Sequence, residues 1–91
     1  MAIATVFTPK SMSATQYDEI IRRLEQAGAG KPKGRAYHVC YGSGDKLNVL
    51  DVWESKELFD AFGKALIPVL QQVGVDPGTP AVTEVHNIIV G

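Results

Sequence analysis

The sequence predicts one α+β domain over residues 1–91, in which a four-stranded antiparallel sheet carries two helices on one face. Six hydrophobic segments follow one another in the order β-α-β-β-α-β, four of them short and β-rich and two with helical spacing. A chain of 91 residues is long enough for one hydrophobic core but not for two. Apolar residues make up 45% and charged residues 21%, which excludes a disordered or low-complexity chain.

Charge and cysteine content exclude several classes of function. Nine Lys and Arg against ten Asp and Glu give a net charge of −1, so no basic excess points to nucleic acid or to an anionic membrane. The single cysteine, Cys40, excludes an internal disulfide and a cysteine-based zinc cluster, and we expect it to be a small buried hydrophobic residue. The N-terminus lacks the features of a signal peptide and no apolar run reaches 18 residues, so we expect a cytoplasmic protein.

The first half of the chain predicts a strand, a helix and a glycine-rich loop. Residues 2–7 are β-rich and stop before Pro9. Ser13 and Gln16 have the spacing of a capping box, and the helix predicted over 14–27 is closed by a glycine. The loop 28–34 follows a helix and precedes a strand. A phosphate-binding loop needs the opposite order, so we do not expect one.

The second half predicts a hairpin, a second helix and a last strand. Strands over 35–41 and 46–54 flank the turn Gly-Ser-Gly-Asp. Ser55 caps a helix that ends at Gly74, and Pro68 inside it is expected to cause a kink. The last strand is predicted over 81–90.

These elements predict a ferredoxin-like arrangement. Right-handed crossovers give the strand order 4-1-3-2 with both helices on the same face. The strands are nevertheless apolar on both sides: Ile3 and Phe7 alternate with Ala4 and Val6 in the first one. Because two helices cover only one face, something else must cover the other. We expect a second copy, so the sequence predicts a sheet-to-sheet homodimer.

The hairpin brings three amphipathic or polar side chains to one face. A two- or four-residue turn places Cys40 opposite Leu47 and Val49 opposite His38, with Asp51 diagonal to His38. Asp51 and Trp53 then share the face of His38. One interpretation is a pocket in which Asp51 orients His38, His38 acts as a base, and Trp53 forms a wall. The other is structural: a satisfied edge histidine, an aspartate bonded to the backbone, and a core tryptophan.

Further residues complete the candidate site. His86 is expected on the last strand, about 14 Å from His38 across three strand spacings, so the two histidines do not form a metal site. Hydrogen bonding in a pocket or an interface is the better hypothesis for His86. Phe59 and Phe62 belong to the apolar stripe of the second helix and are assigned to substrate binding with Trp53 and His86. Tyr37 and Tyr41, on the other side of their strand, are expected at an interface.

The stretch 48–62 resembles the junction between the third strand and the second helix of dimeric α/β-barrel proteins. These include the antibiotic-biosynthesis-monooxygenase-like and stress-responsive barrel proteins. Asp51, Trp53 and Ser55 match the acidic residue, tryptophan and capping serine of that pattern. The resemblance implies that Trp53 lines a pocket between sheet and helices. It also implies a possible cofactor-independent oxidation of a phenolic polycycle, without metal or flavin.

The chain departs from this family at three places. Phe62 and Gly63 stand where many members have a histidine, and the first strand has no asparagine, which disfavours haem degradation. Val49 stands where quinone-forming members have a polar residue. The function predicted is therefore a small-molecule-binding dimeric barrel protein, with cofactor-independent monooxygenation of a phenolic or other aromatic substrate as its most specific form. A non-catalytic ligand-binding or structural dimer module is the alternative. RNA recognition is disfavoured by the charge and by the missing basic and aromatic spacing.

Overall fold

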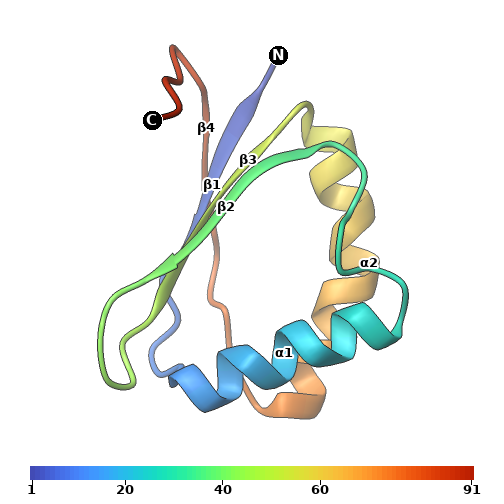
Figure 1. Ribbon diagram of the computed structural model, residues 1–91, viewed down its shortest axis with the longest axis vertical. Coiled ribbons are helices and arrows are strands. Elements are labelled where there is room, and N and C mark those ends of the chain that lie inside the picture. The colour runs from blue at the N-terminus through green and yellow to red at the C-terminus, as the bar shows by residue number, and fades with distance from the viewer.

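The computed structural model describes all 91 residues and confirms the predicted order of elements (Figure 1). The strands are β1 (Ile3–Phe7), β2 (Arg35–Tyr41), β3 (Asn48–Trp53) and β4 (Ala81–Glu84), and the helices are α1 (Ala14–Gln26) and α2 (Lys56–Val73). The sheet is antiparallel with the order β2-β3-β1-β4, which is the predicted order. Both helices lie on one side of it (Figure 1).

The helix ends follow the capping signals in the sequence. Ser13 begins α1 with a reciprocal capping box: its hydroxyl accepts from the Gln16 backbone N–H, and the Gln16 side chain accepts from the Ser13 N–H. Ser55 caps α2 by accepting from the Leu58 N–H at 3.3 Å. Gly74 ends α2 in the left-handed conformation, with φ of 83°. The helix continues through Pro68 as one element. Neither helix has the length and hydropathy that crossing a lipid bilayer requires.

The hydrophobic core lies between the sheet and the helices. Alternation along β1 turns Ile3, Thr5 and Phe7 toward the helices, where all three are buried. Trp53 at the end of β3 is completely buried, and Leu24 of α1 packs into the same cluster. The antiparallel ladder therefore fixes which side chains of each strand reach the space between the layers.

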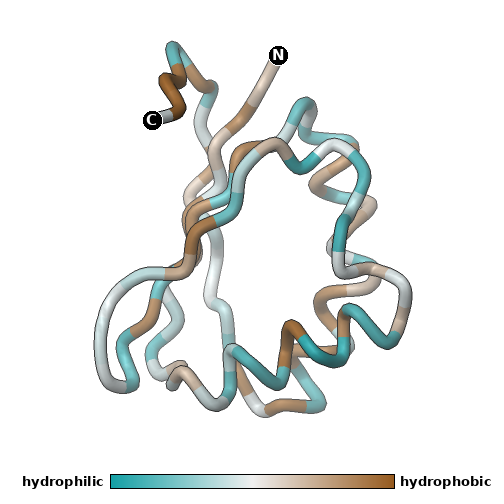
Figure 2. The backbone as a smooth tube through the Cα atoms, in the orientation of Figure 1, coloured by the Kyte–Doolittle hydropathy of each residue, from teal (hydrophilic) through white to brown (hydrophobic).

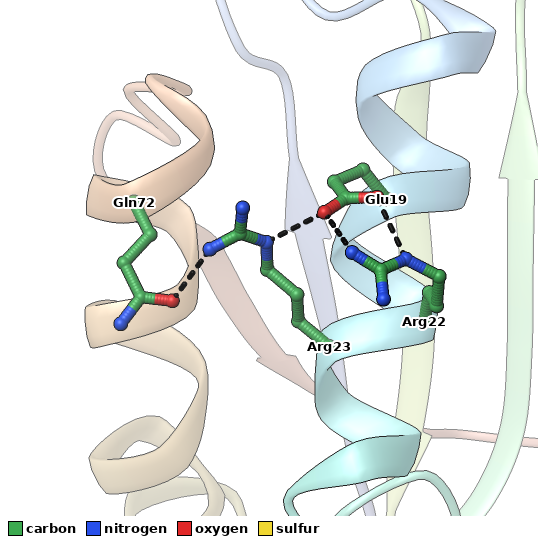
Figure 3. A network of polar contacts seen from close by, with 4 residues as sticks. All are labelled: Glu19, Arg22, Arg23 and Gln72. Atoms are coloured by element: carbon green, nitrogen blue, oxygen red, sulfur yellow. Dashed lines mark hydrogen bonds and ion pairs between the residues drawn. The ribbon is translucent and has the colours of Figure 1, made fainter.

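A polar network on the outer surface joins the two helices (Figure 3). Glu19 accepts hydrogen bonds from Arg22 and Arg23, one turn further along α1, and Arg23 also donates to Gln72 of α2 at 3.0 Å. Hydrogen bonds from the two guanidinium groups lower the pKa of Glu19 to about 2. Because these side chains reach water, the network orients the helix pair more than it stabilises it.

The last strand is shorter than the sequence predicts. It ends at Glu84 rather than at residue 90, although the Val85 N–H still donates to the Ala2 carbonyl at 3.0 Å. Residues 85–91 then leave the ladder and lie beside Ala4, Leu50 and Val52, on the sheet face away from the helices (Figure 1). An apolar run predicts hydrophobic contact, but it does not specify that strand pairing supplies this contact.

Candidate functional site

The β2–β3 hairpin pairs His38 directly with Asp51, two residues away from the predicted register. Cys40 lies opposite Val49 rather than Leu47, so the prediction that Val49 faces His38 was wrong. The reason is the hairpin loop. The Leu47 N–H donates to the Met12 carbonyl, and the Met12 N–H donates to the Asp45 carbonyl, so this stretch pairs with the segment before α1 instead of with β2. A slip of two residues preserves the face of every side chain, so the juxtaposition of His38 and Asp51 survives.

A chain of hydrogen bonds runs from Asp51 through His38 to Tyr17. His38 Nδ1 lies 2.5 Å from Asp51 Oδ1, and the Tyr17 hydroxyl lies 2.6 Å from His38 Nε2. Asp51 is only 4% exposed. Because an ionised carboxylate only accepts, Nδ1 carries the proton and donates to Asp51. In the neutral imidazole Nε2 then accepts from the Tyr17 O–H, which makes Nε2 the basic atom of the chain.

Tyr17 is the functional candidate that sequence reasoning missed. Its spacing from Ile20 and Leu24 places it in the apolar stripe of α1, which indicates only a core position. In the structure its ring stacks on that of His38, with centroids 5.9 Å apart and planes 11° from parallel. Burial raises the pKa of Tyr17, the Cys40 and Asp51 groups add to the increase, and the positive charge of Arg35 opposes it. A tyrosine in an apolar stripe needs a partner for its hydroxyl, but the sequence does not show which strand position α1 crosses.

The three residues stand on the wall of a small cavity between the sheet and the helices. The space open to water-sized spheres inside it is about 60 Å³. Eleven of its sixteen lining residues are hydrophobic, and the wall also includes Arg35 and Phe62. The cavity has room for water molecules, but most of its wall offers them no hydrogen-bond partner. A base on an apolar wall is suited to binding or deprotonating a largely apolar molecule.

The other predicted site residues divide between this cavity and the core. Phe62 lines the cavity. Trp53 does not line it: the indole is completely buried, with its ring centroid 5.3 Å from that of Phe62 and 5.8 Å from that of Phe59. Phe59 also packs against Phe7 and stays off the cavity wall. The structural interpretation of Trp53 as a core residue therefore matches its position, and it supports the wall through Phe62.

His86 lies on the other face of the sheet from this group. It follows β4, at the opposite edge of the sheet from β2, and lines a surface hollow with Tyr37 on the face away from the helices.

Cys40 is half-buried, and burial raises the pKa of its thiol. No group of three or more His, Cys, Asp or Glu side chains is arranged to hold a metal ion.

Comparisons with known proteins give matches among solved structures only. No family model and no curated protein matches the sequence. The protein YjcS is 17% identical, with a TM-score of 0.65 over 94% of this chain and 100% of its own. A mutant of SnoaB, a cofactor-independent oxygenase from Streptomyces nogalater, is 12% identical, with a TM-score of 0.66 over 97% of this chain and 96% of its own. A Deinococcus radiodurans protein, provisionally assigned as an antibiotic biosynthesis monooxygenase, is 14% identical, with a TM-score of 0.63 over 99% and 97% of the two chains.

Sequence identities this low support a common fold and nothing beyond it. The structural agreement covers nearly the whole of each chain. It is consistent with the element order, the strand order and the position of the helices described above. The chain therefore has a ferredoxin-like fold, which it shares with SnoaB and with the Deinococcus radiodurans protein.

Proposed function

We propose that the protein binds a small phenolic or related aromatic molecule in the cavity and deprotonates it, so that the molecule reacts with oxygen without a cofactor. The observation that carries the proposal is the hydrogen-bonded chain Asp51–His38–Tyr17 on an apolar wall. The likeness in fold to SnoaB, a cofactor-independent oxygenase, supports the same class of reaction.

The chain of hydrogen bonds suits a proton relay. The Tyr17 oxygen accepts the acidic proton of the substrate, from a phenol hydroxyl or a ring methylene, while its own proton passes to His38 Nε2. Asp51 then stabilises the imidazolium through Nδ1. Tyr17 stays neutral throughout, in agreement with its raised pKa. The substrate becomes an anion in a mostly apolar cavity, where little water competes for it.

The oxidation that follows needs only the substrate and molecular oxygen. For a ring methylene, the balanced reaction is R₂CH₂ + O₂ → R₂C=O + H₂O. The carbon loses two C–H bonds and four electrons. One oxygen atom enters the product and the other leaves as water. The protein supplies the base, the orientation of the anion and the exclusion of solvent.

The size of the cavity favours a second candidate, a non-catalytic binding module. Its 60 Å³ is well below the roughly 300–1,000 Å³ of drug-sized ligand sites. The Tyr17 hydroxyl also occupies the basic nitrogen of His38. A ring-sized ligand therefore enters only if side chains on the wall move. Met12 and Leu66 belong to this wall, and the unbranched side chain of methionine adapts readily.

Anthrone is a suitable probe of the reaction, because its acidic methylene is oxidised to a carbonyl, and the anthraquinone formed differs from anthrone in its absorption spectrum. We expect quinone formation and stoichiometric oxygen uptake above the buffer rate. His38→Gln and Asp51→Asn should reduce both, whereas Asp60→Asn, which changes an exposed aspartate paired with Lys56, should not. Binding of a phenol without turnover would support the binding module. If no phenol bound, the cavity would not be the site.

We also infer that the sheet face away from the helices pairs with a second copy. This open face carries Ala4, Val6, Val39, Leu50 and Val52 in neighbouring register, and residues 85–91 lie over part of it, where Val52 is already buried. Figure 2 shows the tail as mostly hydrophobic up to the C-terminus. It is largely exposed, with Ile89 at 82% and Val90 at 80%.

The total accessible surface also favours a partner. It is 5822 Å². A compact monomer of this mass exposes about 5,200 Å². A second copy of the chain is the simplest partner, because its own apolar sheet face can pack against this one.

A further inference from the structure

We propose that Arg35 selects anionic ligands, so that the cavity takes an aromatic carboxylate whose ring lies against Phe62 and whose hydroxyl reaches Tyr17. The proposal rests on the cavity being a ligand site, as proposed above, and it names the class of ligand.

A β-bulge turns Arg35 into the cavity. From Tyr37 to Tyr41, β2 pairs regularly with β3, and this register alone would place Ala36 opposite Trp53. The register shifts between Arg35 and Tyr37, and Arg35 is the residue opposite Trp53. One extra residue in a strand reverses the face of the side chains beyond it. Arg35 therefore lies on the same side of the sheet as His38 and lines the cavity.

The guanidinium of Arg35 has no negative partner in the chain. The ion pairs of the protein involve Arg22, Arg23, Lys56 and His38, and none involves Arg35. Its one hydrogen bond is a long one, 3.5 Å from Nη2 to the Gly30 carbonyl. Its remaining polar interaction is with the Phe62 ring, whose centroid lies 5.8 Å from the Arg35 Cζ atom.

The carboxylate on the cavity wall does not pair with Arg35. Asp51 is the carboxylate on the wall, and it is bonded to His38. Arg35 acts electrostatically across the cavity, because its charge lowers the pKa of Tyr17 against the larger effect of burial. A half-buried guanidinium beside an apolar wall attracts a carboxylate strongly, since its planar N–H groups match the two oxygens.

The rest of the wall indicates an aromatic carboxylate rather than a small inorganic anion. Most of the lining is hydrophobic, and Phe62 and Tyr17 offer ring faces. A ligand with a carboxylate at one end and a hydroxyl at the other would place the carboxylate at Arg35 and the hydroxyl at Tyr17, whose oxygen can accept a hydrogen bond while its own O–H is donated to His38. Hydroxybenzoates are the simplest molecules of this class.

The test compares 4-hydroxybenzoate with 4-hydroxybenzyl alcohol, a neutral molecule of similar shape, by calorimetric titration. We expect the wild-type protein to bind the carboxylate at least about tenfold more tightly, which corresponds to about 1.4 kcal/mol. Arg35→Gln should remove this preference, and Arg35→Lys should keep part of it. Arg22→Gln, which removes an exposed arginine of α1, should keep all of it. Circular dichroism shows whether each variant is folded.

The outcomes separate this proposal from the proposed function. If the wild-type protein bound both probes equally, the cavity would remain a ligand site, and the role of Arg35 would be wrong. The same conclusion would follow if folded Arg35→Gln kept the preference. If neither probe bound, both proposals would fail. Because the comparison of the two probes uses the wild-type protein, equal binding would overturn the role of Arg35 even if the Arg35 variants did not fold.

Discussion

His38 Nδ1 lies 2.5 Å from Asp51 Oδ1, and the two residues are direct partners in the β2–β3 ladder. Backbone pairing fixes the separation of their Cα atoms, so the contact does not depend on a flexible loop. Tyr17 approaches the same imidazole from α1, a different layer of the fold. The basic nitrogen is therefore held by the sheet, and its access is controlled by a helix.

The first prediction concerns His38 as the base. In His38→Gln the amide cannot take up a proton, so the rate of quinone formation from anthrone should fall by about 10²-fold or more, a typical loss for a general base. Asp51→Asn should also lower the rate, because the amide cannot stabilise an imidazolium as a carboxylate does. Rates are measured by absorbance and by oxygen uptake. A His38→Gln protein as active as the wild type would exclude His38 as the base.

The second prediction separates two roles of Tyr17. Tyr17→Phe keeps the stacked ring but removes the hydroxyl that bonds to His38 Nε2. If Tyr17 relays the proton, anthrone oxidation should fall by at least about tenfold, and loss of one hydrogen bond should cost roughly 1 kcal/mol of stability. Tyr41→Phe, at an exposed position on β2, is the matched control. An increase in rate would instead mean that the hydroxyl only blocks the base.

Much of this fold was predictable from the sequence, because its signals are local. Capping residues, apolar spacing and turn glycines predicted the helix ends and the strand order correctly. The shared face of His38 and Asp51 was also predictable, because a two-residue slip leaves the face of each side chain unchanged.

The missed features depend on contacts between distant segments. The pairing of Met12 with the hairpin loop changed the register, and a contact between α1 and β2 brought Tyr17 to His38. The bulge at Arg35 placed a cation in the cavity, although strict alternation assigns it to the other face. No local periodicity encodes these three contacts.

The third prediction is a loss of stability at alkaline pH. Burial raises the pKa of Tyr17 above its usual 10 in the folded chain. The unfolded chain therefore loses this proton first as the pH rises, and the free energy of unfolding should fall from about pH 10 up to the folded pKa. Urea unfolding at pH 8, 10 and 11 measures the fall. Tyr17→Phe should show a smaller fall than the wild type; an identical fall in both would show that Tyr17 does not contribute.

The fourth prediction is that the protein is a dimer in solution. Covering the open face should bury more than roughly 1,200 Å² in total, the lower limit for a specific stable interface. Light scattering at micromolar concentration should give about twice the chain mass of 9.8 kDa. Val39→Lys introduces a charge on the open face and should shift the equilibrium to the monomer, whereas Lys64→Glu on α2 should not. A monomeric wild-type protein at this concentration would contradict the inference.

The last prediction concerns the loop that sets the register of His38 and Asp51. A Cβ atom at Gly42 would lie 2.5 Å from the backbone oxygen of Lys46, and Gly42 has φ of 118°. A Cβ atom at Gly44 would meet nothing within 4 Å, although its φ of 61° is also positive. Gly44→Ala should therefore lower the free energy of unfolding by about 1 kcal/mol, the energy needed to hold an alanine in the left-handed conformation. No neighbouring atom has to move to make room for it. Gly42→Ala should cost more, since the backbone of the loop must also move. Urea unfolding compares the two variants, and an equal loss of unfolding free energy would mean that the loop tolerates the displacement.

If the displaced loop shifts the β2–β3 ladder, the chemical shift of the His38 ring should change in Gly42→Ala and stay constant in Gly44→Ala. This second measurement tests whether the loop sets the register, because a mere loss of stability would leave the His38 environment of the folded protein unchanged.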